Sequence, residues 1–108
     1  MITIKNMRTE KPTQLWHVRV DRGSPLGNPF FMHGESERDI VCDQYEVWFK
    51  NAVELDRTGV LLELTELAQI HEKYNRLELY CWCSPKRCHA ETIKKYLESE
   101  VINTKIAD

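Results

Sequence analysis

Alternating hydrophobic and polar residues predict three β-strands, at residues 2–5, 16–20 and 77–81. In the second of these segments, Trp16, Val18 and Val20 share one face, and the residues between them are polar. The third segment is rich in the residue types that favour strands. The stretch from Asp21 to Pro29 contains two Gly and two Pro residues, so it predicts an irregular loop.

Hydrophobic residues at helical spacing predict three helices. We expect the first to begin at a capping box, with Ser36 as N-cap and Asp39 three residues later, and to stop before Thr58. The second ends near residue 74, and the third begins between residues 85 and 89. This order of elements predicts the α/β class, as a small Rossmann-like sandwich in which about three helices flank a short, mostly parallel sheet.

Composition limits the classes of protein that fit this pattern. The chain has 108 residues, of which 42% are hydrophobic, and this predicts a single domain over residues 1–108. A net charge of −2 argues against a polybasic nucleic-acid binder. No segment resembles a membrane span or a secretory leader, so we expect a cytoplasmic protein that does not bind membranes. In that reducing compartment, the four cysteines do not predict a disulfide framework.

The first segment with candidate chemistry is the loop from Asp21 to Phe30. Arg22 supplies a permanent charge with a planar donor geometry that suits a carboxylate or a phosphate. Gly27 leaves its main-chain N–H group uncovered, and the Asn28 amide both donates and accepts hydrogen bonds. An anion-binding loop is one interpretation. The alternative is a structural turn in which Arg22 pairs with a carboxylate.

The second segment runs from Cys81 to His89 and holds three cysteines and one histidine. In one interpretation it is a binding or catalytic site at the N-terminus of the last helix. The dipole and the free N–H groups of that N-terminus would then bind an anion. Cys88 is then the candidate nucleophile, and His89 is the candidate acid, base or donor. In a second interpretation, Cys81 and Cys83 are simply small residues buried in a strand.

A third interpretation is a zinc site formed by Cys81, Cys83, Cys88 and His89. Alternate residues of a strand lie about 6.6 Å apart, whereas two thiolates on one zinc ion lie roughly 3.8 Å apart. The Cys-x-Cys spacing therefore fits a zinc ion only if the strand breaks at Trp82. We keep zinc as a minor alternative and expect neither a metal nor another cofactor.

The two segments are predicted to meet, because each begins where a strand of the sheet ends. Arg38 follows the first loop closely and is a further candidate contact to an anion, although pairing with Glu35 or Glu37 explains it equally well. The three tryptophans are expected to pack in the core.

Taken together, these motifs resemble those of the domain of unknown function 4326 family, whose members are small single-domain proteins of bacteria and tailed phages. The resemblance runs from about Ile2 to Leu97. The residues that carry over are Arg22, Gly27, Asn28, Pro29, Phe30, Cys83, Pro85, Cys88 and His89. This chain has Asp21 where members often have glycine. The resemblance implies no activity.

From the residues themselves we expect a nucleotide, a nucleoside or another phosphate-bearing ligand at the carboxyl edge of the sheet. Whether the protein is an enzyme stays open; if it is one, His89 and Cys88 are the candidate catalytic residues. The candidate ligand-binding residues are Arg22, Gly27, Asn28, Pro29, Phe30, Arg38 and Cys83. The alternative is a phage interaction module that binds a host protein, with nucleic acid a less favoured partner.

Overall fold

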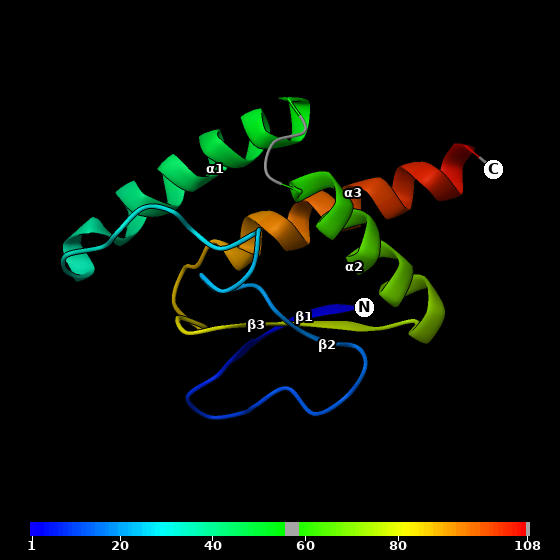
Figure 1. Ribbon diagram of the computed structural model, residues 1–108, viewed down its shortest axis with the longest axis horizontal. Helices are drawn as coiled ribbons and strands as arrows, with labels where there is room; N and C mark the ends of the chain where they lie inside the picture. Colours follow the sequence, from blue (N-terminus) through cyan, green and yellow to red (C-terminus); the bar gives the residue numbers. More distant parts are fainter. Residues whose placement is uncertain (56–58, 108) are drawn as a thin grey trace.

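Three parallel strands form the sheet, in the order β1-β3-β2 (Figure 1). They are β1 (Ile2–Asn6), β2 (His17–Arg19) and β3 (Leu77–Cys81). In the register, Ile2 lies opposite Leu77 and Val18 lies opposite Leu79, so hydrophobic residues of all three strands share one face. The coordinates are a computed structural model, and they describe residues 1–55 and 59–107.

Three α-helices follow the pattern of hydrophobic residues. They are α1 (Arg38–Leu55), α2 (Val60–Tyr74) and α3 (Ala90–Ala107), and a short 3₁₀ turn, η1 (Glu35–Glu37), leads into α1. Ser36 lies inside this turn and makes no side-chain cap, so the predicted capping box is wrong. The predicted boundary at Thr58 lies outside the described residues. Asn75, with a φ of 57°, ends α2 in a left-handed conformation close to the predicted position.

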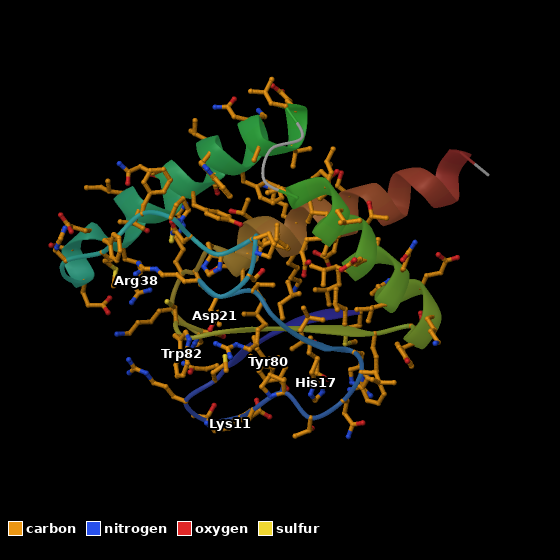
Figure 2. All side chains as sticks on the ribbon, viewed as in Figure 1. Lys11, His17, Asp21, Arg38, Tyr80 and Trp82 are labelled. Atoms are coloured by element: carbon orange, nitrogen blue, oxygen red, sulfur yellow. The ribbon has the colours of Figure 1, made fainter. Side chains whose placement is uncertain are left out.

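All three helices pack on one face of the sheet. Figure 1 shows them above the strands, while the loop between β1 and β2 runs below. The core consists of apolar residues of the strands and helices, chiefly Ile2, Val20, Leu26, Tyr45, Phe49, Val60, Leu64, Leu67, Leu77, Leu79, Ile93 and Leu97. The opposite face carries a cluster of polar side chains. In this cluster, Trp16 Nε1 and His17 Nε2 both contact the Glu78 carboxylate, at 3.2 and 3.1 Å. His17 and Tyr80 are visible on that side in Figure 2.

This architecture confirms the predicted α/β class with a parallel sheet and three helices. Because the strands are parallel, β1, β2 and β3 all end at the same edge, at Asn6, Arg19 and Cys81. No helix in the described part of the chain combines the length and the apolar character that crossing a membrane requires.

Candidate functional site

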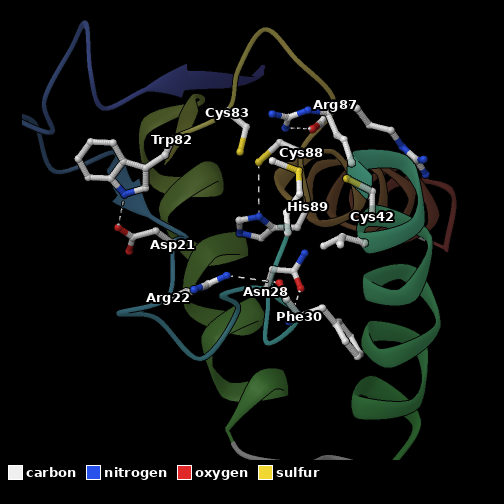
Figure 3. A pocket seen from close by; sticks show the side chains of 13 residues that line it. Asp21, Arg22, Asn28, Phe30, Cys42, Trp82, Cys83, Arg87, Cys88 and His89 are labelled. Atoms are coloured by element: carbon white, nitrogen blue, oxygen red, sulfur yellow. Dashed lines mark hydrogen bonds between the residues drawn. The ribbon is translucent and has the colours of Figure 1, made fainter. Parts of the chain in front are cut away.

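The two loops that the sequence singled out meet in a cavity of about 400 Å³ at the carboxyl edge of the sheet (Figure 3). Of the predicted site residues, those that line this cavity are Arg22, Asn28, Phe30, Arg38, Cys83, Cys88 and His89. Its wall also includes Asp21, Met32, Val41, Cys42, Trp82 and Arg87. Gly27 and Pro29 do not line it; they border a neighbouring hollow with Phe31 and Trp48.

Gly27 has a steric role that the sequence did not predict. A Cβ atom at this position would lie 2.4 Å from the carbonyl oxygen of Asp21 and 2.6 Å from the Cα atom of Arg22. The chain can therefore fold back on the start of its own loop only if residue 27 has no side chain. Leu26 anchors this return, because it is fully buried and its carbonyl oxygen accepts a 2.7 Å hydrogen bond from Tyr45.

Arg22 is the guanidinium of the cavity that lacks a carboxylate. Arg38 forms a two-point contact with Glu35, and Arg87 pairs with Asp39 and Asp43. Among the side chains of residues 1–55 and 59–99, which the structure describes, Arg22 has no ion pair.

Two contacts hold Arg22 in place without neutralising it. It donates a 3.4 Å hydrogen bond to the carbonyl oxygen of Phe30, and it lies 4.0 Å from the centre of the Phe31 ring. The positive charge at this point of the cavity is held in position by neutral groups, so it is available to an anion.

The side chain of Asn28 is held in place by a hydrogen bond to its amide oxygen. Its Oδ1 atom accepts a 2.8 Å hydrogen bond from the main-chain N–H of Phe30, which is the pattern of an Asx turn. The Nδ2 atom forms no hydrogen bond with the part of the chain that the structure describes. The amide therefore presents two donors at the cavity wall.

Cys88 lies just before α3, and His89 holds the N-cap position of that helix. The main-chain N–H of Cys88 donates to Glu91 Oε2 at 2.9 Å, and the main-chain N–H of Glu91 donates to the carbonyl oxygen of Cys88 at 3.1 Å. Anion binding at this N-terminus stays a prediction. The Cys88 side chain is also buried, with 3% of the residue exposed.

His89 forms the floor of the cavity and is itself almost buried. Its Nε2 atom contacts the carbonyl oxygen of Val20, which is an acceptor only, so the proton of the neutral ring lies on Nε2. The Nδ1 atom then faces the Cys88 sulfur at 3.4 Å (Figure 3). Burial lowers the pKa of His89, so the ring is neutral at physiological pH.

Three thiols lie against one another where β3 ends and α3 begins. The Cys88 thiol contacts both Cys81 and Cys83, and these two contacts together with burial raise the pKa of Cys88. The contact with Cys88 and the guanidinium of Arg38 lower the pKa of Cys83 to about 5, against the opposing effect of burial. The same contact with Cys88 also lowers the pKa of Cys81.

The zinc alternative receives no support from this arrangement. Among the described residues, no group of three or more His, Cys, Asp or Glu side chains is placed to hold a metal ion.

Trp82 lies at the mouth of the cavity and is 45% exposed, so the prediction that it packs in the core is wrong. Its indole Nε1 donates a 3.0 Å hydrogen bond to Asp21 (Figure 3). Asp21 also pairs with Arg19 at 2.6 Å. Partial burial alone would raise the pKa of Asp21, but the hydrogen bonds from Arg19 and Trp82 outweigh it and lower the pKa. The indole is thereby held as a fixed aromatic wall.

Comparison with models of known protein families gives a match to most of the chain. Residues 4–99 match the family described as a domain of unknown function, DUF4326. The chain belongs to this family. Comparisons with curated proteins and with solved structures gave no match.

The site of this DUF4326 protein also depends on residues that sequence reasoning missed or underused. Asn6, at the end of β1, donates a 2.7 Å hydrogen bond to the carbonyl oxygen of Ser84 and so fixes the loop after β3. Arg38 was predicted to contact an anion or a nearby glutamate, and the structure shows the pairing with Glu35 together with a contact to Cys83. No local sequence signal links Arg38 to Cys83, because the pattern of a helix reveals nothing about a distant loop.

Proposed function

We propose that the protein binds a nucleotide or another small phosphate-bearing molecule in the cavity at the carboxyl edge of the sheet. The observation that carries this proposal is the state of Arg22, which lines the cavity and pairs with no carboxylate among the side chains that the structure describes, whereas Arg38 and Arg87 are both paired. An arginine in a partly enclosed site favours an anion with several oxygen acceptors, which its planar donors can contact in pairs.

The remaining lining is consistent with such a ligand. A volume of about 400 Å³ lies within the range of roughly 300–1,000 Å³ that small-molecule sites occupy. Phe30 and Trp82 offer flat apolar surface, and the Asn28 amide offers donors for a polar ring edge. In parallel α/β sheets, ligands commonly bind beyond the carboxyl ends of the strands. We assign His89 a positioning role, because both of its ring nitrogens already contact protein atoms.

Thermal-shift measurements on the full chain test the proposal, with nucleotides and sugar phosphates compared against the corresponding nucleosides and sugars. A ligand at a hundred times its dissociation constant adds about 2.7 kcal/mol, which raises the melting temperature by several degrees. We expect a shift that requires the phosphate group. Arg22→Ala should weaken binding by about 10- to 100-fold, the value of one charge-assisted contact, and leave the melting temperature of the free protein nearly unchanged.

Arg8→Ala provides the matched control, because it removes an exposed guanidinium that does not line the cavity. The net charge changes equally in both variants, so a general electrostatic effect would weaken the binding of phosphate compounds equally in both. Equal affinity of Arg22→Ala and the wild type would contradict the proposal. So would a flat response to every phosphate compound, and that result would favour a macromolecular partner.

A further inference from the structure

Arg22 and Asn28 line two spaces at once. One is the cavity at the carboxyl edge of the sheet, and the other is the neighbouring hollow of about 370 Å³ that Gly27 and Pro29 border. Both side chains are tied to the main chain of Phe30 (Figure 3). Arg22 donates to its carbonyl oxygen at 3.4 Å, and Asn28 accepts from its N–H at 2.8 Å. The groups that the proposed phosphate would contact therefore lie where the cavity and the neighbouring hollow adjoin.

The neighbouring hollow offers flat apolar surface, as the cavity does. Trp48 and Phe31 line the hollow, and they correspond in kind to Trp82 and Phe30 of the cavity. Phe31 is 67% exposed, and the Arg22 guanidinium lies over its ring, 4.0 Å from the centre. This contact holds the ring and leaves its other face open to a ligand. Among the described residues that line the hollow, Arg22 alone carries a charge, so the remaining surface suits an uncharged ring group.

Trp48 is held in place by the core beneath it. It is half-buried, it packs against the hydrophobic core, and its ring centre lies 5.4 Å from that of Tyr45. The Tyr45 hydroxyl donates to the carbonyl oxygen of Leu26 at 2.7 Å, and Leu26 directly precedes Gly27. One contact therefore fixes both the return of the loop and the position of Trp48 relative to it. A wall that is already ordered reduces the entropy that a ligand loses on binding.

We propose that the ligand is a dinucleotide, in which two nucleosides are joined through phosphate. The phosphate binds at Arg22 and Asn28. One base occupies the cavity beside Trp82, and the other occupies the neighbouring hollow beside Trp48. Volumes of about 400 and 370 Å³ each lie within the range of roughly 300–1,000 Å³ for small-molecule sites, and a mononucleotide would use only one of them. This inference rests on the proposed function, which it narrows to one class of ligand.

Calorimetric titration of the full chain tests the inference. The probes are dinucleoside monophosphates and dinucleoside diphosphates of adenine, guanine, cytosine and uracil, each compared with the mononucleotide of the same base and the same number of phosphates. The mononucleotide carries more negative charge at neutral pH because its phosphate is terminal, so charge alone would favour it. We expect the best dinucleotide to bind at least about tenfold more tightly, which is the value of one base stacked on an aromatic ring.

Two variants remove the aromatic surface of the neighbouring hollow. In Trp48→Leu, we expect the dinucleotide to lose most of its advantage, while the affinity for the mononucleotide stays nearly unchanged. Phe31→Leu should have the same effect on the advantage, and because Phe31 is exposed, this variant should retain the fold. Trp16→Leu is the matched control: Trp16 is also half-buried, but it lines neither the cavity nor the hollow, so the advantage should persist.

The possible results separate this inference from the proposed function. Dinucleotides that bind no more tightly than mononucleotides, with both weakened by Arg22→Ala, would overturn the inference and leave the proposed function standing. An advantage of the dinucleotide that persists in both Trp48→Leu and Phe31→Leu would also overturn it, because the second base would then lie elsewhere. If the chain bound none of these probes, the proposed function would be contradicted, and this inference with it.

Discussion

Replacing Gly27 by alanine adds one methyl group where the first loop folds back on its own start. The new Cβ would lie 2.4, 2.6 and 2.8 Å from three main-chain atoms of Asp21 and Arg22. None of them is the end of a flexible side chain, so the loop must move as a whole. Overpacking of this kind costs typically about 1–3 kcal/mol, and the rigid neighbours put this case at the upper end.

At about 3 kcal/mol, the melting temperature should fall by roughly 12–24 °C for a domain of this size. Most domains are stable by about 5–15 kcal/mol, so Gly27→Ala should still fold near room temperature, where ligand binding can be measured. Because the displaced atoms belong to Asp21 and Arg22, binding of a phosphate compound should weaken even in the folded fraction. Calorimetric or fluorescence melts, followed by titration below the melting range, measure the two effects separately.

Gly23→Ala is the control within the same loop. Its Cβ would meet only Asp21 Oδ1, at 3.6 Å, which is an ordinary contact, and we expect a change within about 0.5 kcal/mol. If Gly27→Ala melted at the same temperature as Gly23→Ala, the close return of the loop would be wrong, and with it the placement of Arg22.

Three further predictions concern the walls of the site. Tyr45→Phe should cost about 1–3 kcal/mol in urea unfolding, because it leaves the buried carbonyl oxygen of Leu26 without its donor. Burial lowers the pKa of His89 from 6.5, so below that pH the unfolded chain takes up a proton that the folded chain does not. The free energy of unfolding therefore decreases as the pH falls. The wild type should therefore lose more melting temperature than His89→Gln between about pH 7.5 and 5.5. Binding of a phosphate compound should change the emission of Trp82, and Trp82→Phe should abolish that change.

The fold could be predicted from the sequence because the signals for its elements are local. Alternation marks the strands, helical spacing marks the helices, and Asn75 supplies the left-handed end of α2. The edge of the sheet at which the two loops meet could also be predicted, because parallel strands end on the same side. Ser36 was misplaced as a cap because a 3₁₀ turn precedes α1, and nothing in a four-residue pattern separates these two starts.

The site was predictable only in outline, because its contacts join segments far apart in the chain. Gly27 was assigned to ligand contact, yet its role depends on how closely Asp21 and Arg22 approach it in space. The contact of the Glu91 carboxylate with the main-chain N–H of Cys88 depends on where α3 begins, which the sequence pattern placed only to within a few residues. Contacts such as that of Arg38 with Cys83 arise only when α1 packs beside the loop after β3.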